Sequence, residues 1–140
     1  SGKNKSTKIF QALRILVNNE ISELILGLSK SSNLISKNGV IAVISFHSIE
    51  DRICKFFFNE ISSLRKVSRY LPINTCNEVS FNLIKKKPIL PSKIEIEKNA
   101  PSRSAKLRAI KRSTTKKIDT KFIFEKFRYL LEVEKITSRL

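Results

Sequence analysis

The chain has 140 residues, 41% of them hydrophobic, and it carries 28 Lys and Arg against 12 Asp and Glu, a formal charge of +16. This length and apolar content favour a folded domain and exclude a chain that is disordered throughout. The excess of positive charge predicts a polyanionic partner, with nucleic acid as the first candidate and an anionic membrane surface as the second.

Several classes of protein are excluded by what the chain lacks. No stretch approaches the roughly 20 apolar residues that a membrane-spanning helix needs, and the amino terminus has no signal-peptide core, so we expect a cytoplasmic protein with no membrane partner. Cys54 and Cys76 form no Cys-x-x-Cys pair and only one histidine accompanies them, so we expect no metal site and no disulfide framework. The chain contains no methionine, so we expect it to be part of a longer protein.

The first part of the chain has helical spacing. Apolar residues recur at three- and four-residue steps and predict one helix over about residues 7–30, capped by Ser6 or Thr7. Its apolar face consists of Phe10, Leu13, Val17, Ile21, Leu24 and Leu28. After it, Asn38-Gly39 predicts a turn.

The run from Val40 to Phe46 is apolar and rich in β-branched residues, without polar alternation. It predicts a strand that is covered on both faces, and such strands belong mostly to parallel α/β sheets. In those sheets ligands collect at the carboxyl ends of the strands. We therefore expect a functional site directly after this strand.

The polar residues at that place, directly after Phe46, can handle protons and phosphates: His47, Ser48, Glu50, Asp51 and Arg52. Ser48 and Asp51, three positions apart, fit a capping box and predict a helix that begins at Ser48. Helix-start chemistry is therefore the alternative explanation for these two residues, and a packed, hydrogen-bonded turn residue is the alternative for His47. The full cluster is more specific than any single member.

Other enzyme classes fit the sequence poorly. A serine hydrolase would need a Gly-x-Ser-x-Gly elbow, which is absent. Glu50 and Asp51 are consecutive helical residues that point in different directions, so they cannot flank one glycosidic bond. The only glycines, Gly2, Gly27 and Gly39, form no glycine-rich loop for a nucleotide.

The second half of the chain predicts shorter elements. Residues 62–78 form a linker with Arg65, Lys66, Arg69 and Tyr70 in this interpretation. A strand around Val79 to Leu83 ends in a lysine run, Lys85 to Lys87. Ser92 and Glu95 form a capping box that opens a short helix. Residues 105–112 alternate and predict a last strand that pairs antiparallel with the preceding one at a sheet edge, and residues 120–139 return to helical spacing.

Three blocks carry a resemblance to a known family: Phe10-Gln-Ala-Leu-Arg-Ile-Leu-Val-Asn-Asn-Glu20, Gly39-Val-Ile-Ala-Val-Ile-Ser-Phe-His-Ser-Ile-Glu-Asp-Arg52 and Asn99-Ala-Pro-Ser-Arg-Ser-Ala-Lys-Leu-Arg108. In this order and spacing they resemble the carboxyl-terminal half of the 16S rRNA (cytosine-N4)-methyltransferases of the MraW/RsmH type. The resemblance covers roughly residues 3–112.

The resemblance implies an α/β fold, the carboxyl-terminal part of a Rossmann-like class I S-adenosylmethionine-dependent methyltransferase sheet. The run from Val40 to Phe46 would be its fifth strand, and the two late strands its antiparallel edge pair. Residues 1–112 would belong to the methyltransferase domain, and residues 113–140 would be a basic linker with an appended carboxyl-terminal helix.

The implied activity is methylation of the exocyclic N4 of a cytosine, with 16S ribosomal RNA or the small ribosomal subunit as the partner. The family's glycine-rich loop for S-adenosyl-L-methionine is absent from this chain. We therefore expect the cofactor site mostly in a missing amino-terminal part, with no cofactor-binding residue in this chain, and an inactive chain when alone. The competing function is a non-enzymatic basic RNA-binding module; a DNA-binding domain is disfavoured because no recognition-helix pattern stands out.

We hypothesise that the turn lines the cytosine side of the cleft. His47 or Glu50 would orient the base or assist proton loss, and Phe46, Ser48, Asp51 and Arg52 would contact substrate. Further RNA contacts are expected from Arg103, Lys106 and Arg108, of which the last two share a face of the final strand.

Overall fold

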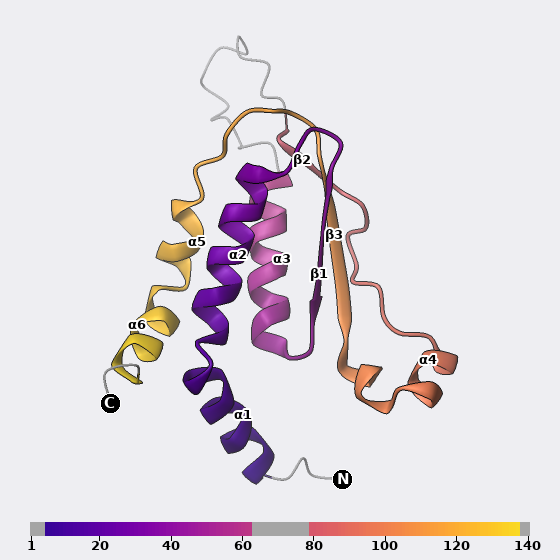
Figure 1. Cartoon of the computed structure of the whole chain (residues 1–140), viewed down its shortest axis with the longest axis vertical. Coiled ribbons are helices and arrows are strands. Elements are labelled where there is room, and N and C mark those ends of the chain that lie inside the picture. Colours follow the sequence, from indigo (N-terminus) through magenta and orange to yellow (C-terminus); the bar gives the residue numbers. More distant parts are fainter. Residues whose placement is uncertain (1–4, 63–78, 138–140) are drawn as a thin grey trace, which may run out of the picture. The chain divides into compact units, whose positions relative to one another are not determined.

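The computed structural model describes residues 5–62 and 79–137 as helices and one small sheet (Figure 1). These residues fall into two compact units, one within Ser1–Lys30 and Asp119–Leu140 and the other within Ser31–Ile118. The linker predicted over residues 62–78, with its Arg65, Lys66, Arg69 and Tyr70, lies outside the described residues except for its first position. Within the described ranges, none of the helices combines the length and the apolar sequence needed to cross a membrane.

The unit within Ser31–Ile118 is built on a three-stranded antiparallel sheet. In it, β1 (Val40–Ser45) and β2 (Phe81–Leu83) flank the longer β3 (Lys106–Arg112), so the order is β1-β3-β2. Both pairings are antiparallel. The predicted strands are therefore confirmed, and so is the antiparallel pairing of the two late ones.

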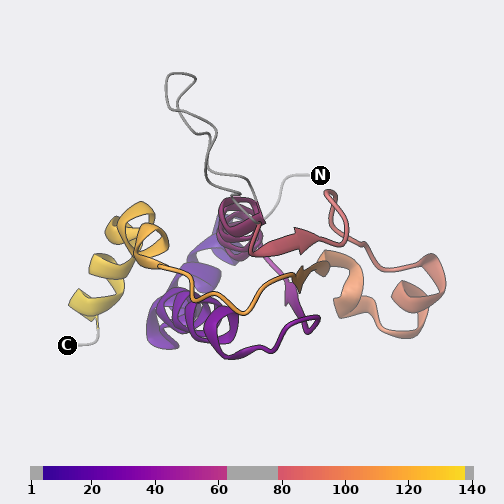
Figure 2. The same ribbon diagram turned by 90° about the horizontal axis from the view of Figure 1, so that it is seen from above.

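One face of the sheet is covered by α3 (Ser48–Ser62), which contacts all three strands (Figure 2). The register sets Ile41 opposite Ile110, and both side chains are buried on that face. The helix contributes an apolar stripe to the same core, as its helical spacing predicts: Ile53, Cys54, Phe57, Phe58 and Ile61.

The turn before β1 is confirmed at Asn38-Gly39. Asn38 has a positive φ of 69°, which asparagine tolerates better than most residues. Gly39 approaches the Ile35 side chain so closely that a Cβ atom would collide with it. The N–H of Asn38 donates to the carbonyl of Arg112, and the Arg112 N–H donates to the Gly39 carbonyl, each at 2.9 Å, so the turn continues the pairing of β1 with β3.

Between β2 and β3 the chain forms α4 (Lys93–Lys98) and a short 3-10 helix, η1 (Ala100–Ser104). Ser92 caps α4, because its hydroxyl accepts a 3.1 Å hydrogen bond from the N–H of Glu95. The short helix expected from this spacing is confirmed.

On the opposite face of the sheet, the side chains of β1 are apolar and uncovered within the described residues. Val40, Ala42 and Ile44 are exposed there, Ile44 to 58%, and β1 pairs with β3 alone. The expectation of a strand covered on both faces of a parallel sheet is therefore wrong for the described part of the chain. The run is apolar on both faces of β1, but α3 covers only one of them. The other face exposes apolar side chains to water, which is unfavourable.

The unit within Ser1–Lys30 and Asp119–Leu140 is helical. Instead of one helix over residues 7–30 it has α1 (Lys5–Val17) and α2 (Glu20–Leu34), and α2 continues into the other unit. Asn19 causes the break, since its φ of 51° is left-handed and cannot continue a helix. Phe10, Leu13 and Val17, which the spacing places on the apolar face of the predicted helix, are exposed.

The tail of the chain forms two helices rather than one. These are α5 (Lys121–Lys126) and α6 (Arg128–Thr137), interrupted at Phe127. The side chains of Ile123 and Phe127 are buried, and the hydroxyls of Thr120 and Ser29 lie 2.6 Å apart. The tail is therefore packed into its unit by apolar and polar contacts.

Candidate functional site

Only two residues, Phe46 and His47, connect β1 with α3. The carbonyl of His47 accepts the first helical hydrogen bond, 3.1 Å from the N–H of Asp51, so His47 is the N-cap of α3. Its ring nitrogen Nδ1 accepts a 3.3 Å hydrogen bond from the N–H of Glu50, as a serine hydroxyl does in an ordinary cap.

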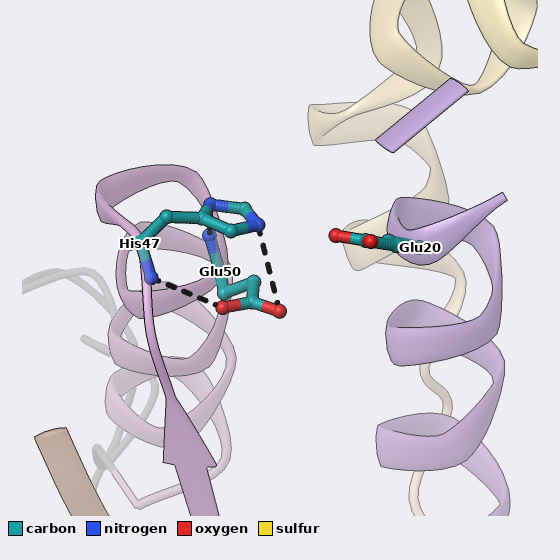
Figure 3. A group of neighbouring side chains, drawn as sticks. All are labelled: Glu20, His47 and Glu50. Carbon is teal, nitrogen blue, oxygen red and sulfur yellow. Dashed lines mark hydrogen bonds and ion pairs between the residues drawn. The ribbon is translucent and has the colours of Figure 1, made fainter. Parts of the chain in front are cut away.

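Glu50 completes the cap from the other side. Its Oε2 accepts hydrogen bonds from the N–H groups of Phe46 and His47, at 2.8 and 3.2 Å. Figure 3 shows the bond from His47. The helix thus begins at Ser48 as predicted, but the capping box is His47 with Glu50, one position earlier than the predicted Ser48 with Asp51. That box assignment was wrong because histidine is an unusual N-cap and serine a common one.

These bonds determine which nitrogen of His47 carries a proton. Because Nδ1 accepts a hydrogen bond, the neutral ring holds its proton on Nε2, which lies 3.5 Å from Glu50 Oε1. The His47 side chain is only 5% exposed. The turn therefore uses both side chains to order its own backbone, and their catalytic role stays a prediction.

Asp51 joins α3 to the sheet. Its carboxylate accepts a 2.7 Å hydrogen bond from Arg108 Nε and a 3.2 Å bond from Lys106 Nζ. Burial acts to raise the pKa of the Asp51 carboxyl, but the hydrogen bonds and charges of Arg108 and Lys106 outweigh it and hold this pKa below its usual value. Asp51 is therefore ionised near neutral pH and neutralises two cations of β3.

Replacing Asp51 with asparagine should lower the free energy of unfolding at neutral pH by about 2–3 kcal/mol, since Arg108 would keep a buried charge without its counterion. Because the folded pKa lies below the unfolded value, this stabilisation is present above about pH 4 and is lost as pH falls through the folded pKa. Urea unfolding between pH 2 and pH 7 measures this, and Asp51→Asn should flatten the acid limb. Glu97→Gln, at an exposed carboxylate of α4, is the matched control.

The alternation of β3 does place Lys106 and Arg108 on one face, as expected, but that face is turned toward α3. The Arg108 side chain is only 10% exposed and is paired with Asp51, whereas Lys106 remains partly exposed. The contact of these two residues and of Asp51 with RNA stays a prediction. Their ion pairs count against it, because the charged groups already have partners.

The remaining candidates are exposed. Ser48 and Arg52 lie on the first turn of α3, Arg103 lies in η1, and Phe46 is 54% exposed. The register pairs Ser45 with Lys106, so the end of β1 and the start of β3 meet at one end of the sheet. Accessible polar groups and one aromatic ring therefore gather near the carboxyl end of β1.

The structure gives little support to a cysteine nucleophile or to a glycine-rich cofactor turn near the end of β1. Burial, and then the nearby carboxylates of Glu50 and Asp51, raise the pKa of the Cys54 thiol to about 12, so it is not a nucleophile at neutral pH. The glycines within the described ranges are Gly27, inside α2, and Gly39, which packs against Ile35. The described residues thus fit no glycine-rich cofactor turn.

The model of the MraW methylase family matches residues 1–113. Ribosomal RNA small subunit methyltransferase H of Persephonella marina is 47% identical over 107 residues, which are 76% of this chain and 32% of that protein. Proteins of the same name from Leptospira borgpetersenii and Borreliella afzelii are 46% and 48% identical over 121 and 109 residues, or 86% and 78% of this chain and 33% and 32% of theirs. The chain thus spans about a third of the length of the curated relatives it matches.

Proposed function

Because this chain belongs to the MraW methylase family, we propose that it is the carboxyl-terminal part of an enzyme that methylates N4 of a cytosine in 16S ribosomal RNA. The observation that carries the proposal is the match over residues 1–113, which includes the capped turn at the end of β1. The relatives named small-subunit ribosomal RNA methyltransferases support the same substrate.

The finer fold belongs to this proposal. In a Rossmann-like methyltransferase sheet, β1 would be the fifth strand, with β3 and β2 as its antiparallel edge. The exposed Val40 and Ile44 support this assignment, as does the edge of β1 that no described strand pairs with, since further strands and helices of the complete enzyme would cover both. The domain boundary at residue 112 also stays a prediction.

S-adenosyl-L-methionine supplies the methyl group in this proposal. The described residues hold no glycine-rich turn for it, so we assign its binding mostly to a part of the enzyme other than this chain. This chain would supply the substrate side, where a fixed base orientation contributes much of the rate of methyl transfer.

The accessible groups near the turn are those best placed to meet RNA. We propose that Phe46 and Ser48 line the cytosine side, and that Arg52 and Arg103 contact phosphates together with the exposed lysines Lys85 to Lys87. The formal charge of +16 supports a polyanionic substrate. Such a substrate, a small ribosomal subunit, would place the enzyme in the cytoplasm.

A hybrid protein tests this function. The whole chain, residues 1–140, would replace the matching third of the Persephonella marina relative, and methyl transfer from labelled S-adenosyl-L-methionine to small-subunit RNA would be measured. We expect N4-methylcytosine to form, and the parent relative is the positive control. A folded hybrid that binds the cofactor but leaves the RNA unmodified would contradict the proposal.

The second candidate is a basic RNA-binding module without catalysis, favoured by the high charge and by the described residues' lack of a cofactor turn. Labelled S-adenosyl-L-methionine added to the 140-residue chain should show no binding under either hypothesis. The hybrid therefore decides: tight RNA binding without methyl transfer supports the module.

A further inference from the structure

Phe46 is an aromatic residue held at an exposed position by an ordered backbone. It directly follows Ser45, which is buried, yet Phe46 itself is 54% exposed. Within the described residues Phe46 is therefore only partly buried, and its exposed part can meet a partner at the end of β1.

The backbone around Phe46 is fixed by the cap of α3. Glu50 Oε2 accepts the N–H of Phe46 at 2.8 Å and that of His47 at 3.2 Å, while His47 Nδ1 accepts the N–H of Glu50 at 3.3 Å. Three backbone donors of this turn are therefore bound by two side chains of the turn itself. Figure 3 shows the side chains of His47 and Glu50 facing one another. The backbone position from which the Phe46 side chain projects depends on both.

The same bonds limit what His47 and Glu50 can do for a substrate. A proton acceptor needs a lone pair that faces the reacting group, but Nδ1 of His47 and Oε2 of Glu50 point to backbone N–H groups. Oε1 of Glu50 lies 3.5 Å from Nε2 of His47. Their geometry suits holding the turn better than accepting a proton.

We infer that Phe46 is the surface on which the target cytosine stacks, and that His47 and Glu50 are positioning residues acting through it. This inference rests on the proposed function for the identity of the base. Every base offers a π-face to an exposed aromatic ring, and the cap fixes the backbone from which this ring projects toward the base.

Binding of RNA to the 140-residue chain tests the stacking. The probe is a single-stranded oligoribonucleotide of about ten nucleotides containing cytidine, with the duplex of the same sequence beside it. We expect Phe46→Ala to weaken single-strand binding about 5- to 150-fold, with little change for the duplex, whose bases are already stacked. Phe46→Tyr should retain the affinity.

Two controls separate stacking from charge and from folding. Phe10→Ala removes a ring that is 70% exposed elsewhere and should leave binding unchanged. The slope of log affinity against log salt should stay the same in Phe46→Ala, because no phosphate contact is lost. Equal losses for single strand and duplex, or no loss at all, would overturn the assignment of Phe46.

The positioning role is tested by replacements that keep the cap. Serine at position 47 and glutamine at position 50 are good capping residues but poor proton acceptors. His47→Ser and Glu50→Gln should therefore restore most of the binding that His47→Ala and Glu50→Ala lose, and should keep methyl transfer in the hybrid. If Glu50→Gln abolished methyl transfer with RNA binding intact, Glu50 would be a proton acceptor and the positioning role would be wrong.

The binding and methylation results can fail independently. A hybrid that never methylates, together with a Phe46→Ala chain that loses single-strand binding, would refute the proposed function and leave the stacking surface standing. A hybrid that methylates as well with Phe46→Ala as without it would refute the stacking surface alone.

Discussion

Replacement of Arg112 with methionine should lower the free energy of unfolding by about 3–5 kcal/mol and the melting temperature by about 10–20 °C. Arg112 is only 2% exposed, although it ends a strand whose other cations reach a carboxylate or solvent. A loss of this size is a large part of the 5–15 kcal/mol that usually stabilises a folded chain, so the variant should be partly unfolded at 37 °C.

The physical reason is that this buried charge is solvated by backbone carbonyls. The guanidinium donates to the carbonyls of Ser32 and Ile35 near the end of α2, and to those of Thr114 and Lys116. Helix ends leave carbonyls without partners and carry partial negative charge, so a cation is favourable there. Arg112 also lies over the Phe81 ring, 5.6 Å from its centroid. Methionine would leave all of these carbonyls without this donor.

Urea unfolding followed by circular dichroism measures the effect, with Lys111→Met as the matched control. Lys111 is the preceding residue, carries the same charge and is exposed, so its replacement should change stability by no more than about 0.5 kcal/mol. Arg112→Lys should fall between the two, because one ammonium cannot reach four carbonyls. A loss below 1 kcal/mol in Arg112→Met would show that the carbonyl network contributes little.

Sequence reasoning succeeded where a feature depends on neighbouring residues. The Asn38-Gly39 turn, the strand from Val40 and the Ser92 cap each follow from a few adjacent side chains. The capping box of α3 is also a local feature, but its prediction was wrong by one residue. Serine is a more common N-cap than histidine, so Ser48 was chosen instead of His47. The spacing His-x-x-Glu before an apolar stripe would have identified the box.

The sequence did not predict which residues far apart along the chain contact one another. Alternation puts Arg112 on the same face as Lys106 and Arg108, but no local pattern reveals that Arg112 meets carbonyls 77 and 80 positions away. The apolar steps in the first part of the chain run on through Asn19, and only its left-handed backbone separates α1 from α2. Position in the fold, rather than residue type, decides these features.

The tail is the clearest case, since the contacts that join it to the rest of its unit are long-range. Residues beyond 113 lie outside the family match, yet Glu134 of α6 is only 2% exposed and binds the amino terminus of α2. Its two carboxylate oxygens each accept a 2.9 Å hydrogen bond, from the N–H groups of Ile21 and Ser22. A carboxylate at this position accepts hydrogen bonds from two backbone N–H groups that the helix itself leaves without a partner. Its negative charge also interacts favourably with the positive end of the helix dipole.

Glu134→Ala should therefore cost about 2–3 kcal/mol and speed amide hydrogen exchange at Ile21 and Ser22 more than elsewhere in α2. Glu132→Ala is the matched control, because Glu132 lies on the same helix in an exposed ion pair with Arg128, and such pairs contribute at most about 1 kcal/mol. Deletion of residues 119–140 should lower the free energy of unfolding more than Glu134→Ala does, since the buried Ile123 and Phe127 are lost as well. If exchange at Ile21 and Ser22 stayed slow in Glu134→Ala, α2 would not depend on the tail for its cap.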